Sequence, residues 1–291
     1  MTLDASVIIP TYDDWPVLQK CLDCLALQSL AQDRFEVIVA NNNAPAAVPA
    51  ALRLPLNARV IHVPKPGSYA ARNAALQVAQ ADALFFTDSD CQPDRMWIEQ
   101  GLTALARLRP IDRVAGAVRM FPKGERWTTP ELYDSLFSLQ QARYAAEGWC
   151  ATANLVTRRA AFDLVGPFSE DAFSGGDKDW GTRAQNLGSV VHFTPDTSIL
   201  HPARETFADL AKKTRRLTGN HHHWERVQGT RLRRTASYLL PRAHSVKQIV
   251  LNGSLSDGDK LRLIWLQYRL SLVTFAEYFR LRVLSGTPTR S

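Results

Sequence analysis

The stretch that decides the fold is Ala83-Leu84-Phe85-Phe86-Thr87-Asp88-Ser89-Asp90. Its first part is apolar and β-favouring and stops abruptly at an acidic triplet, which predicts a buried strand over 83–87. Two carboxylates at positions i and i+2 of an extended chain point the same way, so Asp88 and Asp90 share a face. Open α/β sheets bind ligands at the carboxyl ends of their strands, and the triplet therefore marks a candidate site.

Two interpretations of this triplet are open. The two carboxylates can hold a hard divalent cation, which takes oxygen ligands and bridges to phosphate oxygens. Alternatively, one aspartate caps the next helix and the other is only solvated. A lone Asp-x-Asp favours the second interpretation, so the surrounding sequence has to decide.

The composition is that of an ordinary soluble globular protein. Of 291 residues, 45% are hydrophobic and 22% are charged, and that length can bury a sizeable core. No run approaches the roughly 20 apolar residues of a spanning helix. The opening Met1-Thr2-Leu3-Asp4-Ala5-Ser6 also lacks the pattern of a signal peptide. We therefore expect a cytoplasmic protein.

Charge is distributed unevenly along the chain. Residues 1–200 carry 18 Lys/Arg and 22 Asp/Glu, whereas residues 201–291 carry 17 against 6. The net charge is thus −4 for the first part and +11 for the second, which sums to the +7 of the whole chain. A basic C-terminal part indicates contact with an anionic partner: a diphosphate, an acidic glycan, lipid headgroups or nucleic acid.

Strands and helices are expected to alternate through the first half. Alternation at this spacing predicts right-handed crossovers and an α/β fold with a mostly parallel, doubly wound sheet. From about residue 205 the pattern is helical to the end. The expected strands are 6–10, 35–40, 59–63, 83–87, 151–157 and 190–194, and helices are expected after Asp14, Ser68, Pro93 and Thr129 and near Asp177.

Four other segments place polar side chains at strand ends or helix starts. The amides of the second segment can bond either their own turn or a ligand. In the third, a glycine precedes a helix whose N-terminus attracts anions, with an arginine one turn in. An aspartate in the fourth is either functional or an ordinary first-turn acid favoured by the helix dipole. The segments are Pro10-Thr11-Tyr12-Asp13-Asp14, Asn41-Asn42-Asn43, Lys65-Pro66-Gly67-Ser68-Tyr69-Ala70-Ala71-Arg72-Asn73 and Ser174-Gly175-Gly176-Asp177-Lys178-Asp179-Trp180.

The order of these segments resembles the family 2 inverting glycosyltransferases of the GT-A fold over roughly residues 5–220. That family opens with a strand and Pro-Thr-Tyr/Phe-Asn, then has Gly-x-x-x-Ala-Arg-Asn, the metal-binding Asp-x-Asp, and a helix beginning Glu-Asp-x-Asp. The resemblance implies a Rossmann-like GT-A domain over 1–220, with a nucleotide-sugar half to about 95 and an acceptor half over 96–220. Residues 221–291 would be a basic helical C-terminal extension.

The resemblance also implies roles for individual residues. Asp177 would be the catalytic base. Mn²⁺ or Mg²⁺ would be held by Asp90 and Asp88, with His201 as a further ligand, although a lone histidine after a strand is more often structural. Donor-binding residues would be Pro10, Thr11, Tyr12, Asn41, Arg72, Asp88, Asp90, Lys212, Arg215 and Arg216, and acceptor-binding residues Trp149, Asp179 and Trp180.

Two departures from the family pattern stand out. Asn41 replaces the usual Asp, and because an amide also donates, the identity of the nucleotide base is open. Gly176 replaces the usual Glu before the base, which either loosens that loop or reflects a different acceptor. The expected activity is metal-dependent transfer of a sugar from a nucleotide-diphosphate sugar to a glycan or lipid-linked hydroxyl, as in polysaccharide biosynthesis.

Competing functions are less well supported. A nucleotidyltransferase would need a glycine-rich loop after the first strand, and Pro10-Thr11-Tyr12-Asp13-Asp14-Trp15 has no glycine. A binding module without transferase activity could use the basic tail with His221-His222-His223-Trp224. No nucleic-acid motif accompanies it, so no nucleic-acid partner is expected. A degenerate, binding-only transferase is disfavoured by the three intact carboxylates.

The C-terminal stretch from Asp257 to Leu284 places large apolar residues at helical spacing with arginines between them. One interpretation is a long helix packed on the domain. The other is an interfacial helix on an anionic bilayer, which would make the protein peripheral at the inner face of the membrane.

Overall fold

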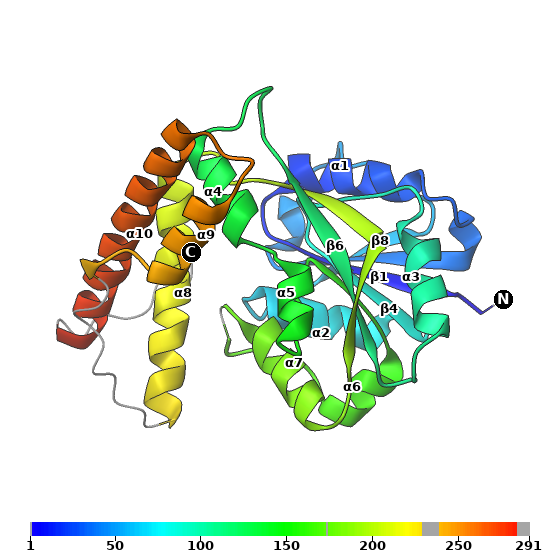
Figure 1. Ribbon diagram of the computed structural model, residues 1–291. Coiled ribbons are helices and arrows are strands. Elements are labelled where there is room, and N and C mark those ends of the chain that lie inside the picture. Colours follow the sequence, from blue (N-terminus) through cyan, green and yellow to red (C-terminus); the bar gives the residue numbers. More distant parts are fainter. Residues whose placement is uncertain (1, 173, 229–238, 284–291) are drawn as a thin grey trace. The chain divides into compact units, whose positions relative to one another are not determined.

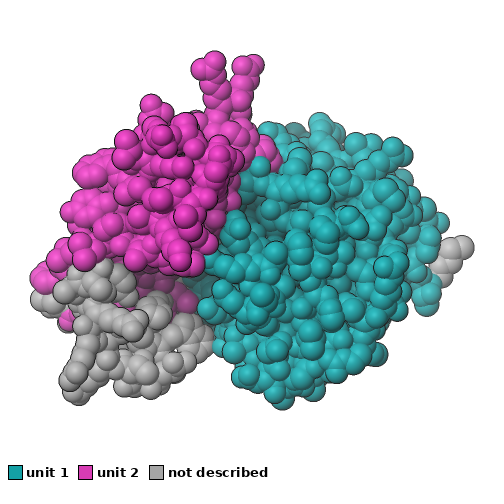
Figure 2. All heavy atoms as spheres, in the orientation of Figure 1, with its two compact units in different colours: residues 1–120, 139–202 teal, residues 121–138, 203–291 magenta. Residues whose placement is uncertain are grey.

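The structure, a computed structural model, describes residues 2–172, 174–228 and 239–283, with side chains for all of these except 221–228 and 283. The chain forms two compact units (Figure 2). Unit 1 comprises residues 1–120 and 139–202, and unit 2 comprises residues 121–138 and 203–291. The functional division expected at residues 95 and 220 stays a prediction.

The described residues contain one eight-stranded sheet, with strand order β3-β2-β1-β4-β7-β6-β8-β5. Each expected strand is present, and β6 and the two-residue β5 come in addition. The strands are β1 (Ala5–Thr11), β2 (Phe35–Asn41), β3 (Ala58–His62), β4 (Ala83–Thr87), β5 (Gln92–Pro93), β6 (Arg113–Phe121), β7 (Asn154–Arg158) and β8 (Val191–Pro202).

The α/β fold class expected from the sequence is confirmed, and the extent of parallel pairing is corrected. Strands β3, β2, β1 and β4 pair in parallel. The pairs β4–β7, β6–β7 and β5–β8 are antiparallel. The sheet is therefore mixed: β3, β2, β1 and β4 form a parallel part, and the strands after the acidic triplet add antiparallel pairs.

Two apolar cores lie on the two faces of this sheet, because side chains alternate along each strand. On β1, Val7 and Ile9 belong to one core and Ile8 belongs to the other. Helices α1 (Trp15–Ala26) and α3 (Trp97–Ala106) contribute to the first core. The second core is covered by α2 (Ser68–Val78), α6 (Arg159–Val165) and α7 (Gly176–Asn186), which lie on the opposite face in Figure 1. A short helix α5 (Gln141–Ala146) also belongs to unit 1.

Unit 2 is helical. It contains α4 (Thr129–Phe137), α8 (Phe207–Gln228), α9 (Ala243–Leu251) and α10 (Asp257–Val283). Helix α4 begins one residue earlier than expected: Thr128, rather than Thr129, is the N-cap, and it forms a reciprocal capping box with Glu131. Leu210 of α8 packs against Leu266 and Leu270 of α10 in a small core.

The long C-terminal helix is confirmed over Asp257–Val283, and Leu284 lies outside the described residues. The side chains of His221-His222-His223-Trp224 are also outside the described part, although their backbone belongs to α8. Among the helices that the structure describes, none combines the length and the hydropathy needed to cross a bilayer.

Candidate active site

Asp88 leaves the carboxyl end of β4 and forms an ion pair with Arg72 of α2. The N-cap residue of α2 is Gly67, whose φ of +124° suits glycine and brings the chain sharply into the helix. Arg72 is only 4% exposed, and its Nε is buried with no hydrogen-bond partner among the described residues. A buried guanidinium with an unused donor beside a strand end is suited to an anionic ligand.

The carboxylate of Asp14 joins the acidic triplet to the first strand. It accepts hydrogen bonds from the hydroxyls of Thr11 and Ser89 and from the Tyr12 N–H at 3.1 Å. Asp14 occupies the N-cap position of α1, where the helix was expected to begin, but its side chain makes no capping bond there. The middle residue of Asp88-Ser89-Asp90 thus turns into the protein and fixes the loop.

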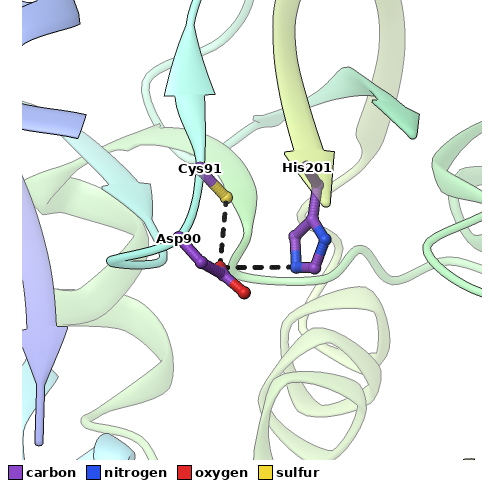
Figure 3. Close-up of side chains that lie close together, drawn as sticks. All are labelled: Asp90, Cys91 and His201. Atoms are coloured by element: carbon purple, nitrogen blue, oxygen red, sulfur yellow. Dashed lines mark hydrogen bonds and ion pairs between the residues drawn. The ribbon is translucent and has the colours of Figure 1, made fainter. Parts of the chain in front are cut away.

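Asp90, Cys91 and His201 lie together at the ends of two strands (Figure 3). The Asp90 Oδ1 atom is 3.5 Å from His201 Nε2 and 4.0 Å from Cys91 Sγ. His201 Nδ1 lies 2.7 Å from the carbonyl oxygen of Pro202, so Nδ1 carries the proton. In the neutral ring the lone pair is then on Nε2 and faces Asp90, as in histidine ligands of metal sites.

These donor atoms fit a hard divalent cation in part. A carboxylate oxygen and an imidazole lone pair facing each other are stabilised by a cation between them. Burial and the nearby aspartates raise the pKa of the Cys91 thiol well above its usual value. Sulfur is also a soft ligand, which suits Zn²⁺ or Cu⁺ better than the hard cations Mn²⁺ and Mg²⁺. Asp90 and His201 fit the expected cation, and Cys91 does not.

Asp177 is the second residue of α7 and is partly buried. Its Oδ1 accepts from the Tyr69 hydroxyl at 3.3 Å and from the Lys178 N–H at 2.9 Å. Burial raises the pKa of Asp177, and the charge of Asp88 raises it further, against the hydrogen bond from Lys178 and the charge of Arg72. A carboxylate with a raised pKa is closer to the range of a useful general base.

The three acids fall on one side of unit 1. Asp88 pairs with Arg72, the Arg72 guanidinium lies 5.5 Å from the centre of the Tyr69 ring, and Tyr69 bonds Asp177. Asp90 follows Asp88 by two residues. Side chains more than 80 residues apart in sequence are therefore brought together by a short series of contacts.

The residues expected at the nucleotide differ in exposure. Tyr12 is 66% exposed and open to a ligand, whereas Pro10 is buried and Thr11 is bonded to Asp14. Asn41 is fully buried: its amide donates to the Ala44 carbonyl and accepts from the Asn43 N–H. The geometry gives Asn41 a role in its own turn, and its contact with a base stays a prediction.

One expected acceptor residue is corrected. Trp180 is 1% exposed, stacks on Phe162 at 4.6 Å and donates its indole N–H to the Gly166 carbonyl. It is a core residue, because it belongs to the inward face of α7. Asp179 forms an ion pair with Arg183 on the same helix.

Trp149 remains a candidate acceptor residue. It is partly exposed and stacks on Tyr144 with ring centres 4.0 Å apart. The Lys178 amino group lies 5.4 Å from its ring centre, which places Trp149 close to the helix start that carries Asp177. The stacked partner Tyr144 was not found by the sequence analysis, and nothing in its local pattern distinguishes it from a core tyrosine.

The cations expected at the diphosphate lie on α8 of unit 2. Lys212 and Arg215 are exposed, and Arg216 is partly exposed. Their contact with a donor stays a prediction.

Comparison with known proteins places these features in a family. The sequence family described as Glycosyl transferase family 2 matches residues 6–166, a stretch that contains β1, α2 and the acidic triplet. This chain belongs to glycosyl transferase family 2. The chain is 34% identical over 215 residues to Glycosyltransferase AglE of Haloferax volcanii, covering 72% of this chain and 69% of that protein. It is 29% identical over 162 residues to a pre-mycofactocin glycosyltransferase of Mycobacterium tuberculosis, covering 53% of this chain and 34% of that protein.

Solved glycosyltransferase structures show the same fold. A mannosyltransferase of Pyrobaculum calidifontis, PcManGT, in complex with GDP-Man and Mn²⁺, is similar with a TM-score of 0.55 at 17% identity, covering 99% of this chain and 77% of that one. S. aureus TarS in complex with UDP-GlcNAc gives a TM-score of 0.54 at 18% identity, covering 97% and 76%. These likenesses confirm the GT-A fold, and membership of a glycosyltransferase family does not favour a nucleic-acid-binding module.

Proposed function

We propose that this family 2 glycosyltransferase moves a sugar from a nucleotide-diphosphate sugar to an acceptor hydroxyl with inversion at the anomeric carbon. The observation that carries the proposal is the series of contacts from Asp88 through Arg72 and Tyr69 to Asp177. It joins a pair of residues suited to a diphosphate to a carboxylate suited to proton transfer. Solved relatives of the same fold bind GDP-Man and UDP-GlcNAc, which supports a sugar nucleotide as donor.

Asp90 and His201, with Asp88, would hold Mn²⁺ or Mg²⁺. A bound cation would neutralise the charge that develops on the leaving diphosphate, where pre-arranged opposite charge lowers the barrier most. Arg72 adds a fixed cation at the same place. A role in donor binding for Lys212, Arg215 and Arg216 of α8 stays a prediction from the family resemblance.

Asp177 would take the proton from the acceptor hydroxyl as its oxygen attacks the anomeric carbon. The new bond forms on the face opposite the departing diphosphate, which inverts the configuration. The carboxylate must be ionised to act, and a positioned base of this kind contributes roughly 10²–10⁴-fold to the rate. The aromatic pair of Trp149 and Tyr144 would present the acceptor to it.

Thermal stabilisation by sugar nucleotides tests the donor and the metal together. We expect at least one UDP- or GDP-sugar of a panel to raise the melting temperature of the full chain with Mn²⁺ present. Asp90→Ala should remove the Mn²⁺-dependent part of that shift. Asp82→Ala, at the opposite end of β4 and exposed, is the matched control and should keep it. An equal shift for Asp90→Ala and wild type would reject the metal site.

Hydrolysis of the best-stabilising donor, in which water takes the sugar and the nucleoside diphosphate is released, tests the base. Asp177→Asn should lower turnover by at least about 100-fold while leaving the thermal shift with donor nearly unchanged. Asp171→Asn, an exposed acid shortly before α7, should retain turnover. Wild-type turnover in Asp177→Asn would reject the assignment of the base.

We propose that the acceptor is a glycan or a lipid-linked glycan, as in polysaccharide biosynthesis. The support for a lipid-linked acceptor comes from the exposed side chains of α10 in unit 2. Helix α10 exposes Leu261, Trp265 and Phe279 at 71%, 61% and 45%, with Arg262 and Arg269 beside them on the exposed side. Apolar and cationic side chains on one helix face suit the interface of an anionic bilayer. A cytoplasmic enzyme, peripheral at the inner face of the membrane, would then meet lipid-linked acceptors.

Flotation with liposomes tests the membrane contact. The full chain should float with vesicles containing anionic lipid and stay behind with neutral vesicles or at high salt. Trp265→Ser should weaken flotation. The control is Leu187→Ser, at an exposed apolar residue of unit 1, which should leave flotation unchanged. Equal recovery of the chain with anionic and neutral vesicles would reject this contact.

A further inference from the structure

We propose that Tyr69 is a positioning residue that holds Asp177 for proton transfer, an inference that rests on the proposed function. The Tyr69 hydroxyl donates to Asp177 Oδ1 at 3.3 Å and accepts from the Asp177 backbone N–H at 3.2 Å. One hydroxyl thus contacts both the carboxylate and the backbone of the same residue. This two-point contact restricts the rotation of the Asp177 side chain.

The Tyr69 hydroxyl keeps its proton over the working range of the enzyme. Tyr69 is 6% exposed, and burial together with the charge of Asp177 raises its pKa above the usual value. It therefore acts as a donor to the carboxylate and favours the ionised form of Asp177. The contact orients the base and opposes the effect of burial on its pKa.

Gly176 makes room for this contact. A Cβ at residue 176 would lie 2.7 Å from Cε2 of the Tyr69 ring, closer than packed carbon atoms approach. The ring is held from other sides by Phe168, with ring centres 5.7 Å apart, and by Arg72. In this chain, the glycine that replaces the usual Glu therefore leaves space for the Tyr69 ring.

The contact between Tyr69 and Asp177 also links the proposed base to the residues proposed to bind the leaving diphosphate. Tyr69 and Arg72 stand one turn apart on α2, and Arg72 pairs with Asp88. A donor diphosphate that orders Arg72 would order the ring beneath it and hence the carboxylate of Asp177. Base and leaving group are then positioned by one helix.

Several other groups face Asp177 and contribute to its titration. They are Arg72 of α2, Asp88 after β4, Tyr144 of α5, Cys150 before β7 and Lys178 on its own helix. Tyr69 is distinguished among them by its direct side-chain hydrogen bond to the carboxylate. Removal of the hydroxyl alone therefore tests its role while those groups are kept.

The test is the pH profile of nucleoside diphosphate release from the donor that stabilises the wild type best. Tyr69→Phe removes one hydrogen-bond donor to the ionised carboxylate of Asp177 and should raise its pKa. The acid limb of the profile, where turnover falls as Asp177 becomes protonated, should therefore move to higher pH by about 0.5–1 unit. Turnover above that limb should fall by about three- to tenfold as the base loses orientation. Tyr133→Phe, which removes a buried hydroxyl bonded to Gln267 in unit 2, should leave the limb in place.

A double-mutant cycle separates the contact from a general loss of packing. Gly176→Ala should move the ring and shift the limb in the same direction, whereas in a Tyr69→Ala background it should add no further shift. An unchanged acid limb in Tyr69→Phe, with Asp177→Asn inactive, overturns the role of Tyr69 alone. A wild type that releases no nucleoside diphosphate, or an active Asp177→Asn, overturns the proposed function instead.

Discussion

Asp134 offers the sharpest test of the electrostatics that hold unit 2 together. This aspartate of α4 has no exposed side-chain surface, and it pairs with Arg204 at 3.0 Å and with Lys213 of α8 at 3.1 Å. It also accepts a hydrogen bond of 2.5 Å from the Ser138 hydroxyl. Exchange of Asp134 for Asn keeps the shape and removes the charge, which leaves two cations near a neutral amide.

The size of the effect follows from the titration of Asp134. Burial alone would raise its pKa, but Lys213 and Arg204 outweigh it and lower the pKa to about 2. Relative to the usual 3.8, a pKa lowered by nearly two units corresponds to roughly 2–3 kcal/mol of folding free energy. Removal of one partner of a buried pair costs about 3–5 kcal/mol. We therefore expect Asp134→Asn to lose about 2–5 kcal/mol at pH 7.

The pH dependence has a definite sign. A carboxylate with a lowered pKa in the folded state contributes stability above its unfolded pKa, and this is lost as the pH falls through its folded value. The gap between wild type and Asp134→Asn should thus be full at pH 7 and shrink from about pH 4 toward pH 2.

Urea unfolding of the full chain, followed by circular dichroism at several pH values, measures this gap. Asp257→Asn, a fully exposed acid at the start of α10, is the control and should change stability by less than about 1 kcal/mol. A stability of Asp134→Asn within about 0.5 kcal/mol of wild type at pH 7, or a gap that does not depend on pH, would contradict this role of Asp134.

Three further predictions concern unit 1. Burial raises the pKa of Asp177. Turnover should therefore begin to fall, as the pH is lowered, at a pH above about 4, the usual range of an aspartate. A fall that begins only below that range would contradict the role of Asp177 as base. Gly101→Ala would place a Cβ 2.4 Å from the Phe85 ring, so urea unfolding should show a loss of about 1–3 kcal/mol. The control is Gly258→Ala on α10, whose Cβ would meet only Ser256 Oγ at 3.9 Å and which should not destabilise. The fully buried amide of Asn154 accepts a hydrogen bond from the Trp97 indole and donates to two backbone carbonyls. Asn154→Leu removes these bonds inside the core and should lower the melting temperature strongly. An unchanged melting temperature would contradict this.

The sequence predicted the fold well where local patterns are strong. The strand over 83–87 and its acidic end are placed as expected, because a short apolar run between polar turns has few alternatives. Strand β6 was missed, since Arg113 opens it and a buried arginine is untypical of a strand. Arg113 is tolerated there because it bonds the Ser189 hydroxyl and the carbonyls of Gly148, Gly181 and Ser189.

For the site, charge was easier to predict than burial. The carboxylates Asp88 and Asp177 fall on one side of unit 1, as the motif order indicated. The exposure of individual side chains could not be predicted from the sequence. Trp180 was therefore expected to bind the acceptor, whereas it is a buried core residue. Tyr69 was quoted within a motif without a role, because its contact with Asp177 spans 108 residues and depends on the missing side chain at Gly176.

The change of strand direction within the sheet has a consequence for specificity. Thr87, just before the acidic triplet, pairs with Asn154, the first residue of antiparallel β7. The loop over 147–153, which carries Trp149, therefore opens at the same edge as the triplet but belongs to the antiparallel half. New sequences in that loop can alter what the enzyme accepts while the parallel strands that meet the donor stay untouched.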